Sequence, residues 1–260
     1  MKHENFKTCD QSGFCKRNRA YADIVSSLGS SWTSPYTLVS DTIKINNGRV
    51  TGTILKSVGD GHAVELPLTI NIQGNGVARI IVDEAKRRKG DIELRHGSQA
   101  RKERYNEVGD WALVGDPKLD LKVNGESSSA ETIVSYGPDN KYKVVIKHDP
   151  LKIEFVKDGE VHVKFNGNGL MNMEHWRPKI EKEVKPEGEE AQGEQATEQE
   201  ADKGEDESTW WDESFGGNTD SKPKGPESVA MDITFPGYEH VYGIPEHASS
   251  LSLKETRYES

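Results

Sequence analysis

Residues 62–72 read HAVELPLTINI, and every second residue of this stretch is apolar. Such an alternation is typical of a β-strand that buries one face, because successive side chains of a strand point to opposite sides. Residues 73–76 read QGNG, which favours a turn, and apolar residues resume directly after it. The stretch therefore predicts a hairpin that needs a second layer of structure over its apolar face. The members of that face are Val64, Leu66, Leu68, Ile70 and Ile72.

The same pattern recurs along the chain. Short apolar or alternating runs flank the turn sequences Asn46-Asn47-Gly48, Pro138-Asp139-Asn140 and Asp158-Gly159, and residues 228–235 alternate at Val229, Met231, Ile233 and Phe235. About ten strands are expected, whereas helix is expected only as a weak turn around residues 21–28. Short strands joined by hairpin turns predict an all-β fold, an antiparallel β-sandwich.

The only two cysteines, Cys9 and Cys15, lie in the N-terminal stretch NFKTCDQSGFCKRNR, which we interpret as a loop. Two cysteines are too few for a structural zinc site, and the CxxC redox spacing is absent. A local disulfide, with Gly13 easing the bend, fits a polar loop better than two free buried thiols of a cytosolic protein. A disulfide would indicate an oxidising compartment. The first ten residues contain no apolar segment of the signal-peptide kind.

The net charge of −10 is concentrated in one segment: residues 181–207 hold twelve Asp or Glu and three Lys, which leaves about −1 for the rest. A nearly neutral remainder argues against a surface for nucleic acid or anionic membrane. No apolar run approaches the ~18 residues of a membrane span. We predict that 179–208 is a disordered acidic insertion, with an acidic docking segment for a basic partner or calcium as the alternative. The predicted organisation is a segment with the local disulfide (1–30), the first part of the sandwich (31–178), this insertion, and the remainder of the sandwich (209–260).

No catalytic or metal-binding motif stands out. The eight histidines are scattered, no cofactor is expected, and the NGNG at 166–169 is interpreted as a turn rather than a phosphate loop. Trp210 and Trp211 follow the acidic segment, and they either stack on a sugar or pin the chain to the sandwich. We favour pinning.

Three stretches carry a resemblance to a known family. NFKTCDQSGFCKRNR at 5–19, GLMNMEHWRP at 169–178, and 221–248, which ends in YGIPEHA, occur in the same order in family 31 glycoside hydrolases, with an acidic run between the last two. The resemblance covers essentially the whole chain. It implies the galactose-mutarotase-like sandwich that precedes a (β/α)₈ catalytic barrel, with both catalytic aspartates in the barrel and none in this chain.

The resemblance also implies an activity. It is that of a retaining α-glucosidase of the endoplasmic-reticulum lumen, which trims α-1,3-linked glucose from the N-glycans of new glycoproteins. The expected partners are the barrel, a non-catalytic β subunit and the glycan. Tyr242, Glu246 and His247 are the residues expected nearest the substrate pocket, and this chain alone is expected to be inactive. We also expect an exposed apolar patch where the barrel docks.

Two other functions remain open at this stage. A free-standing carbohydrate-binding module would use Trp176, Trp210 or Trp211 as a stacking platform. An interaction scaffold would recruit a partner through the acidic insertion.

Overall fold

The computed structural model describes residues 6–59, 61–85, 118–119, 122–175, 210–222, 225–243 and 250–253. The acidic insertion predicted at 179–208 lies outside these residues, as do Trp176, Glu246 and His247. Within the described part of the chain, no helix is long and apolar enough to cross a membrane.

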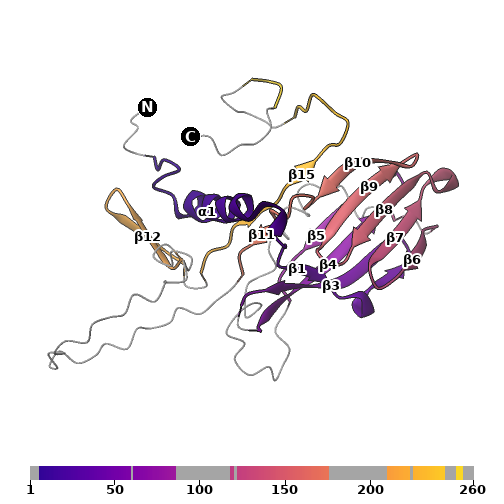
Figure 1. The fold of residues 1–260 in the computed structure, drawn as a ribbon, viewed down its shortest axis with the longest axis horizontal. Helices are drawn as coiled ribbons and strands as arrows, with labels where there is room; N and C mark the ends of the chain where they lie inside the picture. The colour runs from indigo at the N-terminus through magenta and orange to yellow at the C-terminus, as the bar shows by residue number, and fades with distance from the viewer. Residues whose placement is uncertain are drawn as a thin grey trace.

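Two antiparallel sheets stack face to face (Figure 1). The first has the order β1-β3-β4-β5, with β2 also paired to β3, and the second has the order β15-β10-β9-β8-β7-β6. The predicted β-sandwich is therefore confirmed. The strands of the first sheet are β1 (Tyr36–Leu38), β2 (Lys44–Asn46), β3 (Arg49–Ser57), β4 (Ala63–Ile72) and β5 (Ala78–Val82). Those of the second are β6 (Asn124–Ser127), β7 (Glu131–Tyr136), β8 (Tyr142–Lys147), β9 (Lys152–Lys157), β10 (Glu160–Phe165) and β15 (Ile233–Thr234).

The core lies between the two sheets, and the alternating series of β4 forms its centre. All five apolar residues of that series are at most 2% exposed. They meet apolar side chains of the second sheet, among them Val134, Val144, Ile146 and Ile153. The period-2 pattern thus identified the buried face correctly, because alternation reflects the pleat of the strand itself.

Two of the predicted turns have the backbone that their residues favour. Asn47 and Gly48 have φ values of 46° and 75°, and Asp158 and Gly159 have φ values of 52° and 87°. Two successive left-handed residues are what a two-residue hairpin loop needs, and Asn, Asp and Gly adopt this conformation at the least cost. These dipeptides therefore set the register of β2 with β3 and of β9 with β10.

Residues 228–235 differ from the single strand that their alternation predicts. They form β14 (Val229–Ala230), which pairs with β11 (Asn172–Met173), and then β15, which pairs with β10. Asp232, between the two strands, accepts hydrogen bonds from the Asn168 and Leu170 amides at 2.7 and 2.9 Å. The segment thus changes partner at Asp232, and the apolar residues that follow stay largely exposed.

A second difference concerns the N-terminus, where we expected a loop and only a weak helical turn. Helix α1 (Gly13–Leu28) occupies this region and includes Cys15. Its buried residues are Gly13, Asn18 and Ala22, which are small or polar. The helix therefore lacks the apolar stripe by which amphipathic helices are recognised in a sequence.

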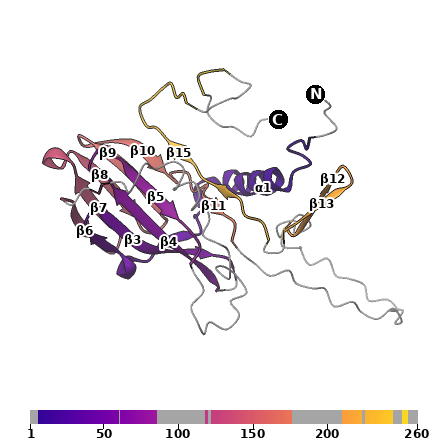
Figure 2. The same cartoon turned by 180° about the vertical axis from the view of Figure 1, so that it is seen from behind.

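The remaining elements are short. Strands β12 (Asp212–Phe215) and β13 (Asn218–Ser221) form a hairpin, and 3₁₀ turns occur at η2 (Gly29–Ser31), η3 (Ser40–Thr42) and η4 (Pro138–Asn140). Both views show α1 beside the sandwich (Figures 1 and 2). The end of α1 that is nearer the sandwich lies close to β11, and the β12–β13 hairpin lies toward the opposite end of the helix.

Candidate functional site

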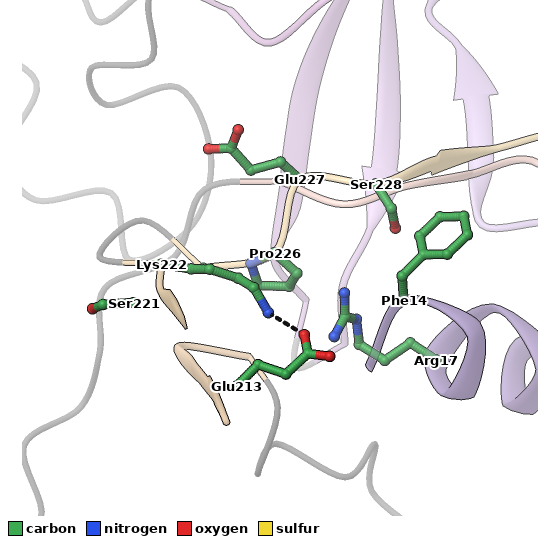
Figure 3. A pocket seen from close by; sticks show the side chains of 9 residues that line it. Phe14, Arg17, Glu213, Ser221, Lys222, Pro226, Glu227 and Ser228 are labelled. Carbon is green, nitrogen blue, oxygen red and sulfur yellow. Dashed lines mark hydrogen bonds and ion pairs between the residues drawn. The ribbon is translucent and has the colours of Figure 1, made fainter. Parts of the chain in front are cut away.

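A pocket of about 610 Å³ lies between the first turns of α1, the β12–β13 hairpin and residues 225–228. Figure 3 shows Phe14 and Arg17 entering it from the helix, and Glu213 and Lys222 entering from the hairpin side. Pro226 and Ser228 belong to the third wall. Three segments that are far apart in the sequence therefore meet at this one place.

Glu213 ties the hairpin to the start of α1. Its carboxylate accepts a hydrogen bond from the Gly13 amide at 2.9 Å and ion pairs from Lys7 and Lys222 at 2.9 and 2.8 Å. Ser12 at the N-cap makes no side-chain capping bond, so a carboxylate from a distant hairpin takes over part of that role. A negative charge at a helix N-terminus also interacts favourably with the helix dipole.

Glu174 fixes the second turn of the same helix. Arg17 forms an ion pair with it, and Ser228 donates to it from its amide at 2.7 Å and its hydroxyl at 2.5 Å. The side chains of Arg17 and Glu174 are only 10% and 5% exposed. Since Ser228 directly precedes β14 and Glu174 directly follows β11, the pair anchors α1 to this two-stranded sheet.

Both carboxylates stay ionised at neutral pH. Burial by itself raises the pKa of Glu213, but hydrogen bonds from Lys222, Gly13 and Lys7 outweigh it and lower the pKa from 4.5 to about 2. Burial likewise opposes the shift at Glu174, where bonds from Arg17 and Ser228 hold the pKa below its ordinary value. A general acid of a glycosidase needs a raised pKa. The pocket therefore has the chemistry of a structural joint rather than that of an acid–base site.

Acidification should weaken this joint. The folded-state pKa of Glu213 lies below its unfolded value, so its contribution to stability is complete above about pH 5 and is lost as the pH falls toward 2. We expect the free energy of unfolding, measured by urea titration, to fall over this range. The fall should be smaller in Glu213→Gln, which has no carboxylate to protonate. Equal pH profiles for the two proteins would contradict the assignment.

The candidate residues from the sequence do not gather in this pocket. Tyr242 is exposed near the end of the described chain, with its ring 6.4 Å from that of His240. Cys9 and Cys15 lie at the start of α1 as free thiols, with Cys15 donating to Cys9 across an Sγ–Sγ distance of 2.9 Å. That hydrogen bond raises the pKa of the Cys15 thiol, with burial and the charge of Cys9 as further causes. The disulfide therefore stays a prediction. Among the described residues, no group of three His, Cys, Asp or Glu could hold a metal ion.

Two of the tryptophans considered as a sugar-stacking platform, Trp210 and Trp211, do not form a flat, exposed surface. Trp210 is 8% exposed, and its ring centroid is 5.4 Å from that of Trp211 at an interplanar angle of 57°. A sugar face needs a flat, exposed aromatic surface, so a tilted pair with one buried ring fits the pinning role better.

The NGNG stretch is a turn, as its sequence predicted. Asn166 has a φ of 55° and is fully buried, and its side chain donates to the Leu151 carbonyl and accepts from the Met171 amide at 2.7 and 2.9 Å. Helix α1 and the segment after it contact the same turn. The Tyr21 hydroxyl of α1 donates to the Gly169 and Met171 carbonyls, and Nε1 of Trp32, which follows η2, donates to the Gly169 carbonyl.

The sequence did not point to Glu174 and Glu213, the two carboxylates that bond to α1. Their partners on α1 are 157 and 200 positions away along the chain. Asp and Glu are abundant in this sequence, and no spacing distinguishes these two from the others. Only the tertiary structure brings them to the helix.

Comparisons with known proteins identify one family over most of the chain. A family model described as the glycosyl hydrolase 31 N-terminal galactose mutarotase-like domain matches residues 67–260. Glucosidase 2 subunit alpha of Schizosaccharomyces pombe is 36% identical over 254 residues, which are 96% of this chain and 25% of that protein. The chain thus spans about a quarter of the length of the curated relatives it matches.

The chain is also similar to solved structures of glucosidase II alpha subunits over nearly its whole length. A crystal structure of an alpha3-Glc2-bound glucosidase II alpha subunit is 49% identical with a TM-score of 0.80, and the match covers 99% of this chain and 26% of that one. A crystal structure of an ER glucosidase II heterodimeric complex, which consists of a catalytic subunit and the binding domain of a regulatory subunit, is 50% identical with a TM-score of 0.79. That match covers 98% of this chain and 25% of the other.

Proposed function

Because this chain belongs to the glycosyl hydrolase 31 family, whose N-terminal galactose mutarotase-like domain it matches, we propose that it is the N-terminal domain of an α-glucosidase of the glucosidase II kind. The enzyme would trim α-1,3-linked glucose from N-glycans of nascent glycoproteins in the lumen of the endoplasmic reticulum. Its similarity over nearly its whole length to glucosidase II alpha subunits carries this proposal. The alpha3-Glc2 bound to one of them supports the linkage.

The catalytic carboxylates would lie outside this chain. A retaining glycosidase needs one carboxylate as nucleophile and a second as acid and then base, about 5–5.5 Å apart. In the pocket described here Glu213 is ionised and accepts bonds from Gly13, Lys7 and Lys222, so it is committed to holding α1 in place. The role of the sandwich would be to support the catalytic barrel and one side of the active-site entrance. Tyr242, Glu246 and His247 remain our candidates for that side.

Two macromolecular contacts belong to the proposal. The first is with the catalytic barrel of the same subunit. The second is with a glucosidase II β subunit, which is supported by the heterodimer of a catalytic subunit with the binding domain of a regulatory subunit. The substrate would be the N-glycan of a glycoprotein.

Hydrolysis of an α-1,3-linked glucose disaccharide tests the proposal. The chain of 260 residues alone is expected to release no glucose, and the full-length polypeptide that contains it is expected to release glucose with retention of the anomeric configuration. Glucose release by the short chain would show that carboxylates of the sandwich are catalytic. An inactive full-length polypeptide would contradict the proposed activity.

An oxidising lumen would make the disulfide between Cys9 and Cys15 part of the same proposal. The two thiols already touch, and closing a loop of seven residues is worth about 2 kcal/mol in the chain-entropy account. We expect intact-mass measurement after folding with oxidised glutathione to show the loss of two hydrogen atoms, because oxidised glutathione accepts two electrons and two protons as the S–S bond forms. Cys9→Ser should be less stable than the oxidised chain by about the same 2 kcal/mol. Persistent free thiols under these conditions would contradict the pairing.

A further inference from the structure

Two groups that bind one oxygen of Glu213 lie beside the two cysteines in the sequence. Lys7 precedes Cys9 by two positions, and Gly13 precedes Cys15 by two positions. The Lys7 ammonium and the Gly13 amide both bind Oε1 of Glu213, each at 2.9 Å. The Sγ atoms of the two cysteines are 2.9 Å apart. A bond between these sulfurs would therefore join the two short stretches that place the donors to Glu213.

The turn between the two cysteines is held by hydrogen bonds near the solvent. The amides of Gln11 and Ser12 donate to the Thr8 carbonyl at 3.0 and 3.1 Å, and the Thr8 amide donates to Oε1 of Gln11 at 3.0 Å. Thr8, Cys9 and Gln11 are exposed. Exposed backbone hydrogen bonds with little apolar cover open at a low free-energy cost. A covalent bond from Cys9 to Cys15 would keep this turn closed when its hydrogen bonds open.

The β12–β13 hairpin reaches this turn through Glu213 and Phe215. Oε2 of Glu213 is engaged on the hairpin side, where Lys222 donates to it at 2.8 Å, so Oε1 is the oxygen that reaches the start of α1 (Figure 3). The Lys7 ammonium also lies 5.8 Å from the centre of the Phe215 ring, within the range of a cation–π contact. Both contacts of Lys7 depend on the backbone next to Cys9.

We propose that the Cys9–Cys15 pair is a redox switch, in which disulfide formation strengthens the attachment of the β12–β13 hairpin to the start of α1 through Glu213. The inference rests on the disulfide of the proposed function, and it adds what the disulfide controls. A closed ring that already places Lys7 and Gly13 reduces the conformational freedom that is lost when they bind Glu213. Coupling between two sites is reciprocal, so Glu213 stabilises the disulfide by the same factor by which the disulfide strengthens the attachment.

Oxidised glutathione supplies the oxidant for this step. The thiolate of one cysteine attacks its disulfide bond, which releases one glutathione thiolate and leaves a mixed disulfide on the protein. The thiolate of the other cysteine then attacks the protein sulfur of that mixed disulfide and releases the second glutathione thiolate. The two protons lost by the cysteines end on the two molecules of reduced glutathione. The protein loses two electrons, and oxidised glutathione gains them.

A glutathione titration of the full-length polypeptide that contains this chain tests the switch. Samples are equilibrated at increasing ratios of reduced to oxidised glutathione, quenched with acid, alkylated and digested with trypsin. Cleavage after Lys7 and Lys16 releases residues 8–16, a single peptide that holds both cysteines, so its mass reports the disulfide directly. We expect the equilibrium constant for disulfide formation to be at least about fivefold smaller in Glu213→Ala than in the original protein.

Two further variants identify the cause. Glu213→Gln keeps an oxygen for the Gly13 amide but loses the charge that pairs with Lys7, so its constant should lie between the other two. Ser214→Ala is the matched control, because Ser214 is the next residue of the same strand and its hydroxyl contacts Thr219 inside the hairpin. Its constant should equal that of the original protein. Equal constants for the original protein and Glu213→Ala would overturn the switch.

Hydrogen exchange measures the same coupling from the hairpin side, and on the original protein it needs no variant. Amides of β12 and β13 should exchange at least about fivefold faster after reduction of the disulfide, whereas those of β4 in the core serve as an unchanged reference. In Glu213→Ala the exchange of the hairpin should no longer depend on the redox state. Hairpin exchange that is independent of the redox state in the original protein would overturn the switch.

The failures of the two proposals can be told apart. A disulfide that forms with the same constant in every variant refutes the switch alone. A peptide 8–16 that stays reduced in every sample refutes the pairing and the switch together. Disaccharide hydrolysis by the original full-length polypeptide tests the glucosidase activity separately, because neither measurement of the switch depends on that reaction.

Discussion

Replacing Arg17 with alanine is expected to lower the free energy of unfolding by roughly 3–5 kcal/mol, because the variant removes the guanidinium that pairs with the buried Glu174 carboxylate. Glu174 is 5% exposed on its side chain, so water compensates its charge poorly compared with the guanidinium. Part of the carboxylate's hydrogen bonding survives, since Ser228 still donates to it from its amide and hydroxyl. Denaturant unfolding followed by circular dichroism measures the effect.

Arg19 supplies the matched control two positions further along the same helix. It pairs with Asp10 at 3.0 Å, but the two side chains are 41% and 86% exposed. An ion pair of this kind contributes at most about 1 kcal/mol, so Arg19→Ala should be nearly neutral. Adding Glu174→Gln to the Arg17 variant should recover part of the lost stability, because it removes the buried charge that the guanidinium had balanced. Similar losses for Arg17→Ala and Arg19→Ala would show that burial of Glu174 does not matter.

Replacing Asn166 with alanine is the second large effect, with an expected loss of roughly 2–5 kcal/mol. The side chain bonds to the Leu151 carbonyl and the Met171 amide, and each backbone group left buried without a partner costs roughly 1–3 kcal/mol. Alanine also tolerates the left-handed backbone at this position, with its φ of 55°, less well than asparagine does. The midpoint and slope of urea unfolding measure the loss.

Two companion variants separate the causes. Asn168 is exposed in the same turn and makes its bond to Asp232 through its backbone amide, so Asn168→Ala should change stability by less than about 0.5 kcal/mol. Asn166→Gly accepts the left-handed backbone but lacks the amide side chain, so it should retain most of the loss. A glycine variant as stable as the original protein would assign the effect to the backbone and contradict the role of the two hydrogen bonds. Since Tyr21 and Trp32 bond to the same turn, a loosened turn should also raise amide hydrogen exchange in α1.

The candidate site was much harder to predict than the fold. The sequence pattern singles out neither Arg17 nor its partner Glu174. Tyr242, one of the residues expected nearest the substrate pocket, is exposed and is not among the residues that line the pocket described here. Glu246 and His247 lie outside the described residues. Three short stretches of sequence were enough to predict the family of the chain. They do not predict which side chains contact one another in the fold.

By itself the sequence determined the sandwich. The alternation of β4 and the left-handed dipeptides Asn47-Gly48 and Asp158-Gly159 act through the local geometry of the backbone, which a few neighbouring residues dictate. Only the tertiary structure decided where α1 lies and where residues 228–235 change partner. Gly13 meets Glu213, Arg17 meets Glu174 and Asp232 meets the turn at 166–170 because the packed sheets bring distant segments together. A contact of this kind depends on the arrangement of whole elements in space. The residues next to either partner show no periodic sequence pattern from which the contact could be predicted.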